Sequence, residues 1–292
     1  MKKLLAPVLI LAVVAVVGFM PGGKKLKVFI SVDMEGVAGV VNWEDVSRTG
    51  KDYDLFRQLM TLETNAAIQG ALDAGATGIV VRDSHGSARN ILPNKLLAEA
   101  KLLRDWSGGP LSMMEGIDES FDAVVFIGYH AKAGTPDAPL AHTMSSSTID
   151  DVSVNGVSLP EAGINALIAG IYDVPVVYCA GDRAICDQVK GLFGTVGTGM
   201  VKEGIGTANL NLHPSKARDL IRLGVRKALE DLDDYKPYKL EAPYTLELQL
   251  KQRNLVDRGT AYPGAVKKDD FTLVYKSDDM MEIWKAFQGM RN

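Results

Sequence analysis

The sequence predicts an α/β fold in which a mainly parallel sheet is flanked by helices and followed by a smaller C-terminal α+β subdomain. Short apolar segments alternate with helical ones, which is the order of successive β-α-β units. Several apolar segments end in carboxylates or histidines, as expected where the carboxyl ends of parallel strands line a ligand site. The chain has 292 residues, of which 47% are hydrophobic, so a large core is possible.

Composition excludes several classes of protein. The formal net charge is -4 and no dense basic stripe follows the N-terminus, which argues against nucleic-acid binding. The two cysteines, Cys179 and Cys186, form neither a disulfide framework nor a Cys-x-x-Cys zinc site, although a single disulfide between them remains open. No glycine-rich phosphate-binding motif is present.

Residues 1–24 differ from the rest of the chain. Two lysines precede an almost wholly apolar run over residues 4–20, and a Pro-Gly-Gly sequence follows. This pattern is typical of a secretory signal peptide or an N-terminal membrane anchor. We therefore expect the remaining chain to be exported to the periplasm or the extracellular space, or anchored through residues 4–20. Membrane contact is expected only through this segment.

Residues 25–194 are expected to form the catalytic α/β domain. Its strands are recognised as apolar runs, its helices by apolar residues at helical spacing, and its turns by glycine, proline and asparagine. The expected elements, in order, are a strand at 27–36, a loop at 37–54, a helix at 55–74, a strand at 78–82, a short helix at 96–103, a strand at 121–129, a loop at 132–148, a hairpin around Asn155-Gly156, a helix at 161–171 and a strand at 174–179.

Residues 195–292 are expected to form the α+β subdomain. Its helices and strands follow the same rules, but no cluster of catalytic residue types occurs in it. The expected elements are an extended segment at 200–211, a helix at 214–232, strands at 244–250 and 271–275, and a helix at 278–290.

The first strand ends in two carboxylates. Side chains alternate faces along a strand, so Asp33 and Glu35 project to the same side. Oxygen ligands of this kind suit hard or borderline cations, whereas hydration at a strand end is the plain alternative. His85 and His130 follow two further apolar strands at the same edge of the predicted sheet, which favours a shared metal site.

Three further residues carry weaker signals. Glu161 is a fifth candidate ligand, although an acid in the first turn of a helix is also favoured by the helix dipole. His142 lies in a loop rich in serine and threonine, where a functional and a solvated residue are equally consistent with the sequence. His213 precedes Pro214 at a helix start, and we interpret it as structural or exposed.

Four short motifs resemble the signatures of the zinc-dependent D-aminopeptidase family of dipeptide-operon-type metallopeptidases. They are Ser-Val-Asp-Met-Glu-Gly at 31–36, Asp-Ser-His at 83–85, Gly-Tyr-His-Ala at 128–131 and Glu-Ala-Gly-Ile-Asn-Ala at 161–166. The resemblance extends from about residue 25 to the C-terminus. It implies a ring-shaped homo-oligomer, with a decamer as the expected form, that acts on short peptides.

The resemblance also implies roles for single residues. It places five metal ligands on Asp33, Glu35, His85, His130 and Glu161, and the catalytic histidine, described as a nucleophile in the family, on His142. Three carboxylates and two imidazoles suit two zinc ions per subunit if one carboxylate bridges, and manganese or iron also fits. Asp33 is the expected bridge because it lies deepest in the strand.

The expected function is removal of N-terminal, D-configured residues from short peptides by a metal-dependent aminopeptidase. Residue chemistry alone favours His142 for proton transfer or charge stabilisation over a nucleophilic role. Two alternatives remain open: an exported amidohydrolase acting on cell-wall peptides, and a non-catalytic protein that binds metal or peptide.

Overall fold

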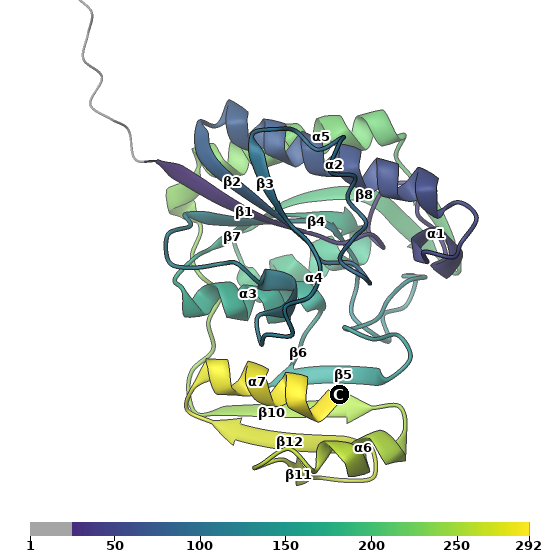
Figure 1. Cartoon of the computed structure of the whole chain (residues 1–292), viewed down its shortest axis with the longest axis vertical. Coiled ribbons are helices and arrows are strands. Elements are labelled where there is room, and N and C mark those ends of the chain that lie inside the picture. Colours follow the sequence, from purple (N-terminus) through teal and green to yellow (C-terminus); the bar gives the residue numbers. More distant parts are fainter. Residues whose placement is uncertain (1–24, 292) are drawn as a thin grey trace, which may run out of the picture.

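The computed structural model describes residues 25–291 and shows two sheets joined by helices (Figure 1). The larger sheet has seven strands in the order β3-β2-β1-β4-β7-β8-β9, and only β9 runs antiparallel to its neighbour. The expected α/β fold with a mainly parallel sheet is therefore confirmed. The predicted signal peptide or anchor lies outside the described residues. Within 25–291, every helix is too short or too polar to cross a membrane.

Helices cover both faces of the seven-stranded sheet (Figure 1). One face carries α2 and α5, and the other carries α3 and α4. The strands are β1 (Leu26–Val32), β2 (Ala76–Asp83), β3 (Ala100–Leu103), β4 (Ala123–Tyr129), β7 (Val176–Asp182), β8 (Gly197–Ile205) and β9 (Ala208–Asn211). The helices are α2 (Tyr53–Asp73), α3 (Glu161–Ile171), α4 (Arg183–Phe193) and α5 (Pro214–Glu230).

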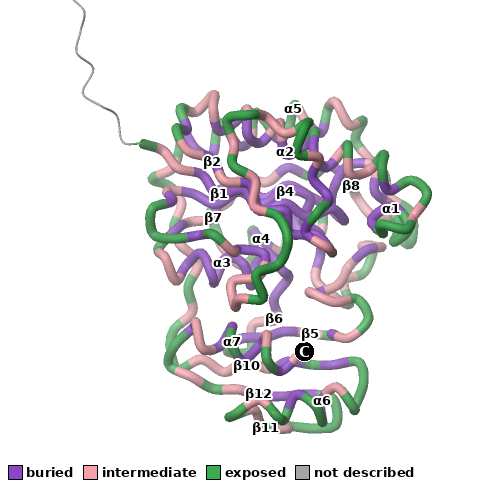
Figure 2. Tube along the Cα trace, viewed as in Figure 1, coloured by how far each residue is buried: buried purple, intermediate pink, exposed green. Residues whose placement is uncertain are grey.

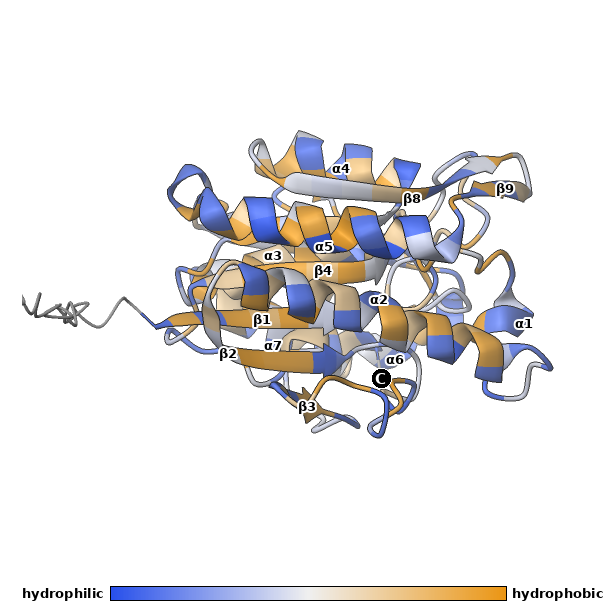
Figure 3. Cartoon of the chain, turned by 90° about the horizontal axis from the view of Figure 1, so that it is seen from above, coloured by the Kyte–Doolittle hydropathy of each residue, from blue (hydrophilic) through white to orange (hydrophobic). Residues whose placement is uncertain are grey.

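The outer helices form because their apolar residues recur at helical spacing. Met60, Ala67 and Ile68 face the sheet from α2, and Ile221 and Val225 do so from α5. Figure 3 shows these two helices side by side, with apolar and polar residues alternating along each. They contact each other as well as the sheet, so one core occupies this whole face.

The second sheet has five strands in the order β11-β12-β10-β5-β6. They are β5 (Ile149–Val154), β6 (Val157–Ser158), β10 (Tyr244–Leu250), β11 (Val266–Lys267) and β12 (Thr272–Ser277), accompanied by α6 (Arg253–Gly259) and α7 (Met280–Arg291). The apolar side of α7 lies between this sheet and α3. A single core therefore runs from the lower face of the large sheet to the second sheet, as the buried segments in Figure 2 show.

The two sheets do not follow the expected division of the chain near residue 194. The segment that contains β8, β9 and α5 extends the large sheet, whereas the earlier hairpin β5–β6 pairs with β10 in the second sheet. The reason is long-range strand pairing, which composition along the chain does not reveal.

Several local predictions were wrong or incomplete. The expected helix at 96–103 is absent, and β3 pairs there with β2, because backbone pairing at the sheet edge overrides local periodicity. The expected loop at 37–54 contains the short helix α1 (Trp43–Val46), which begins at a capping box between Asn42 and Asp45. Sequence reasoning missed α4 and two 3₁₀ turns, η1 (Ser112–Met114) and η2 (Leu232–Asp234). The hairpin at Asn155-Gly156 is confirmed.

The contact between α2 and α5 depends on a glycine. A β-carbon at Gly70 would lie 2.5 Å from the carbonyl oxygen of Arg222. We expect Gly70→Ala to lower stability by about 1–3 kcal/mol, the usual cost of overpacking, which corresponds to roughly 2–4 °C per kcal/mol in the thermal midpoint. Gly191→Ala is the control, because Gly191 is a helical glycine with nothing within 4 Å. An equal rise in both midpoints would contradict the close contact.

Candidate metal centre

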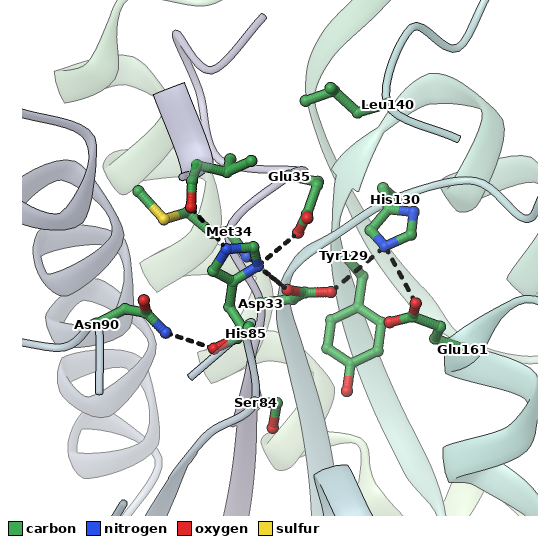
Figure 4. Close-up of polar contacts among 12 residues, drawn as sticks. Asp33, Met34, Glu35, Ser84, His85, Asn90, Tyr129, His130, Leu140 and Glu161 are labelled. Carbon is green, nitrogen blue, oxygen red and sulfur yellow. Dashed lines mark hydrogen bonds and ion pairs between the residues drawn. The ribbon is translucent and has the colours of Figure 1, made fainter. Parts of the chain in front are cut away.

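The candidate site lies where the strand order of the large sheet reverses. The chain passes from β1 to β2 and β3 on one side and later to β4 and β7 on the other, so a crevice opens between the carboxyl ends of β1 and β4. Asp33 and Glu35 follow β1, His130 follows β4, and His85 follows β2 (Figure 4). Glu161 is the first residue of α3. The structure therefore brings together all five predicted ligands.

A glycine allows the ends of β1 and β4 to meet closely. The amide of Gly36 donates a hydrogen bond to the carbonyl oxygen of Gly128 at 2.7 Å. A β-carbon at Gly36 would lie 1.8 Å from the carbonyl oxygen of Tyr129, so no other residue fits without a backbone shift. This contact holds the turn at residues 34–37, which carries Glu35, against the neighbouring strand.

Asp33 lies between two histidines. Its Oδ1 is 3.1 Å from His85 Nδ1 and its Oδ2 is 3.4 Å from His130 Nε2. Glu35 Oε2 lies 3.0 Å from the same His85 nitrogen, and Glu161 Oε1 lies 3.5 Å from the same His130 nitrogen. All five side chains are at least nine-tenths buried. Asp33 thus faces both halves of the cluster, which is the position a bridging carboxylate needs.

Each histidine has one nitrogen committed to a backbone carbonyl. His85 Nε2 donates to Val46 O at 3.0 Å, and His130 Nδ1 donates to Ala131 O at 2.9 Å. In a neutral imidazole the other nitrogen then carries a lone pair, and here it faces carboxylate oxygens. Two acceptors face each other favourably only with a cation between them, and metal-binding histidines are commonly oriented by such a carbonyl. This donor set fits a metal ion.

His130 gives the clearest sign that the donor set fits a metal ion. Within the described part of the chain, its buried Nε2 has no hydrogen-bond partner, although it lies near both Asp33 and Glu161. A buried nitrogen of this kind normally has a partner. A metal ion among these atoms would supply one.

Protons balance the charges when no metal is bound. Burial lowers the pKa of His85 and His130, but the neighbouring carboxylates outweigh it and raise both well above the usual value. Burial, and then the charge of Glu35, raises the pKa of Asp33 to about 6. Burial opposes ionisation of Glu161, but His130 lowers its pKa to about 2. The site therefore requires positive charge, whether from protons or from metal.

His142 lies beside this cluster. Its Nδ1 donates to Leu140 O at 2.9 Å, and its Nε2 lies 3.5 Å from Glu161 Oε1. The imidazole stacks on that of His130 with ring centroids 4.1 Å apart, and Trp43 contacts it edge-on. Two sets of ligand atoms lie close enough to hold an ion: Asp33, Glu35 and His130, and His130, His142 and Glu161. His142 is therefore near enough to bind metal as well as to act in catalysis.

Sequence reasoning missed a buried lysine that supports the site. Lys202 comes from β8, and its ammonium donates to the carbonyl oxygens of Glu35 and, at 2.7 Å, Val40. Burial lowers its pKa to about 8. It holds the segment that carries Glu35, but a single lysine in a strand gives no sequence signal for this role.

Other residues at strand ends are structural. Asp182, the last residue of β7, accepts hydrogen bonds from the amides of Ile185 and Ala131 and lies outside both sets of ligand atoms. Asn90 donates to the carbonyl oxygen of His85 and so holds that loop (Figure 4). His213 caps α5 and is exposed, as expected.

The cluster opens into a cavity of about 600 Å³. This is a common size for a small-molecule site. Residues from both halves of the chain line it: Asp33, Glu35, Trp43, Val46, Ser47, Ser84, His85, Gly86, Trp106, Ser112, Met113, His142, Met144, Ser145, Ser146, Glu161 and Arg291.

The two sets of ligand atoms predict unequal losses of metal. His130 belongs to both sets, so we expect His130→Ala to lose most of the bound zinc. His85 belongs to neither set but contacts Asp33 and Glu35, so His85→Ala should lose a smaller share. Elemental analysis of zinc-loaded protein measures this. His213→Ala, which removes an exposed histidine, should keep its zinc. Full zinc retention by both site variants would refute the ligand assignment.

Comparison with known proteins agrees with this geometry. Residues 26–289 match the sequence profile of the peptidase M55 family, described as D-aminopeptidase. The chain is 33% identical over 269 residues to a D-aminopeptidase from Bacillus subtilis strain 168, an alignment that covers 91% of this chain and 96% of that protein.

A solved structure is similar throughout. It is the zinc-dependent D-aminopeptidase DppA from Bacillus subtilis, described as a self-compartmentalizing protease, with a TM-score of 0.87 and 32% identity. The match covers 91% of this chain and 96% of that one. The resemblance seen in four short motifs thus extends over the whole described fold, and this chain belongs to the D-aminopeptidase family of metallopeptidases.

Proposed function

We propose that the protein is a zinc-dependent aminopeptidase that removes N-terminal, D-configured residues from short peptides at a site for two zinc ions. The observation that supports it most is the buried cluster, in which lone-pair nitrogens of His85 and His130 face Asp33, Glu35 and Glu161 across distances of 3.0–3.5 Å. The relatives act as D-aminopeptidases by name, and the donor set suits zinc.

The side chains of the site would have two roles, holding the metal and transferring a proton. Zinc bound here would polarise the peptide carbonyl and lower the pKa of a water molecule. Asp33, which faces both histidines, would hold zinc together with Glu35 and Glu161. His142 lines the cavity with its Nε2 turned toward the cluster, where it would move a proton between water and the leaving amine or stabilise developing charge.

The alternatives find less support. A binding protein needs no imidazole in addition to the metal ligands, and the relatives are hydrolases. An amidohydrolase acting on cell-wall peptides would use the same cluster but depends on export, which we propose only from the composition of residues 1–24.

We also propose that the chain assembles as a homo-oligomeric ring of ten subunits. The related Bacillus subtilis structure is described as self-compartmentalizing, which requires several copies. On this chain, Ile205 and Leu210 are 62% and 64% exposed at the outer β8–β9 edge of the large sheet. Exposed apolar side chains on an edge strand are typical of a contact between subunits.

The role of His142 can be separated from metal binding. We expect His142→Ala to keep its zinc while kcat falls about 10²–10⁴-fold, because only a proton transfer is lost. KM should change much less. Zinc content and kcat on D-Ala-D-Ala and L-Ala-L-Ala are measured on one preparation. Loss of zinc together with activity would make His142 a ligand, and unchanged kcat would remove it from the mechanism.

The assembly proposal predicts a change in mass. The double variant Ile205→Lys/Leu210→Lys should sediment and scatter light as a smaller species than the unsubstituted protein, because two charges replace apolar contact area. Leu55→Lys is the control, since Leu55 is 53% exposed on α2, away from the β8–β9 edge. A fully active monomer before any substitution would contradict the oligomer itself.

A further inference from the structure

Arg291 brings a positive charge to the cavity from the far end of the chain. It is the last residue of α7, whose C-terminal end lies below the carboxyl ends of β1 and β4 in Figure 1. It lines the same cavity as Asp33, Glu35 and Glu161. The helix reaches this position because its apolar side packs between α3 and the second sheet.

The charge of Arg291 has no anionic partner within ion-pair distance in the described part of the chain, although the charge of Glu161 acts on it. Its guanidinium lies over the Phe287 ring, with Cζ 5.2 Å from the ring centroid. Burial lowers its pKa and the charge of Glu161 opposes this, but a guanidinium stays protonated in proteins. Among the described residues that line the cavity, Arg291 is the only lysine or arginine.

A short peptide has matching charges. Its α-amino group is cationic and its free α-carboxylate is anionic, and an aminopeptidase must place the amino end at the reacting centre. The acidic cluster lies there, so the carboxylate end must extend into the rest of the cavity. A guanidinium is the side chain that binds a carboxylate best, because its planar N–H groups match both oxygens.

We propose that Arg291 binds the free C-terminal carboxylate of the substrate and so makes the enzyme selective for short, unblocked peptides. This inference rests on the proposed aminopeptidase function. A longer or C-terminally amidated peptide presents no carboxylate at this position. In this proposal Arg291 selects substrates by their free C-terminal carboxylate, and the metal cluster hydrolyses the peptide bond.

The competing explanation is that Arg291 only offsets the dipole at the end of α7, where basic residues are favoured. A substitution would then affect all substrates through stability and would not distinguish acids from amides. Lys285 provides the matched control, because it is an exposed cation on the same helix that pairs with Glu282 at 2.7 Å. Lys285→Gln removes the same charge without touching the cavity.

The experiment compares Ala-Ala dipeptides, in both configurations, with their C-terminal amides on zinc-loaded protein. We expect the unsubstituted enzyme and Lys285→Gln to favour the acid by roughly 10- to 100-fold in kcat/KM, the range for one charge-assisted hydrogen bond. In Arg291→Gln this ratio should fall toward one through a higher KM for the acid, with turnover of the amide kept. Arg291→Lys should retain part of the preference.

Binding is measured without turnover by calorimetry. Ala-Ala in which a methylene replaces the scissile carbonyl cannot be hydrolysed, and its acid form should bind Arg291→Gln more weakly than the unsubstituted enzyme, while its amide should bind both equally. Equal use of acid and amide by the unsubstituted enzyme, or an equal loss on both in Arg291→Gln, overturns the proposal. If no peptide is hydrolysed at all, the proposed function fails instead.

Discussion

Mutual repulsion among buried carboxylates is the constraint on which this structure depends. Asp33, Glu35 and Glu161 are each at most 3% exposed and surround the same two imidazoles. Charges buried in this way are tolerated only when paired, and a core built for stability alone would contain apolar residues here. The cluster therefore needs cations to be stable. Its stability and its capacity to bind metal have the same origin, because the positive charge that it requires can come from protons or from a bound cation.

The parallel sheet supplies the geometry that holds these groups together. Adjacent strands β2, β1 and β4 end at the same edge of the large sheet. Helix α3, which packs on the face opposite to α2 and α5, begins near that edge. Backbone contacts then fix the details, since Gly36 lies directly against β4 and the buried ammonium of Lys202 holds the carbonyl oxygen of Glu35. Four of the candidate ligands are thus carried by strand ends and Glu161 by the start of α3, and backbone hydrogen bonds help to fix the positions of their donor atoms.

The second sheet completes the site without contributing to the metal cluster. Its helix α7 packs on α3, the helix that begins with Glu161, so the two sheets share one core. This packing places Arg291, at the end of the last helix, in the lining of the cavity that also contains the carboxylates of the candidate metal centre. The proposed catalytic residues and the proposed substrate-binding residue therefore come from different sheets and line one cavity.

The sequence alone determined the fold class and the six residues of the centre, because both follow from local rules. Alternating strands and helices imply a parallel sheet, and Asp33, Glu35, His85 and His130 each follow a strand, at the edge where such sheets bind ligands. Glu161 and His142 were weaker candidates from the residues alone, and the motif resemblance implied their roles as a ligand and as the catalytic histidine. That these six side chains meet is confirmed, whereas their individual roles stay predictions.

Only the tertiary structure decided the rest. Pairing with β2 made residues 100–103 a strand, and pairing with β7 placed β8 in the large sheet. Backbone carbonyls of distant residues set which nitrogen of His85 faces the carboxylates. Lys202 donates to residues more than a hundred positions away, and Arg291 reaches the cavity only through the packing of α7, so nothing in their local sequence distinguishes them from surface cations. Local patterns report secondary structure and residue chemistry, but long-range packing determines which charges meet.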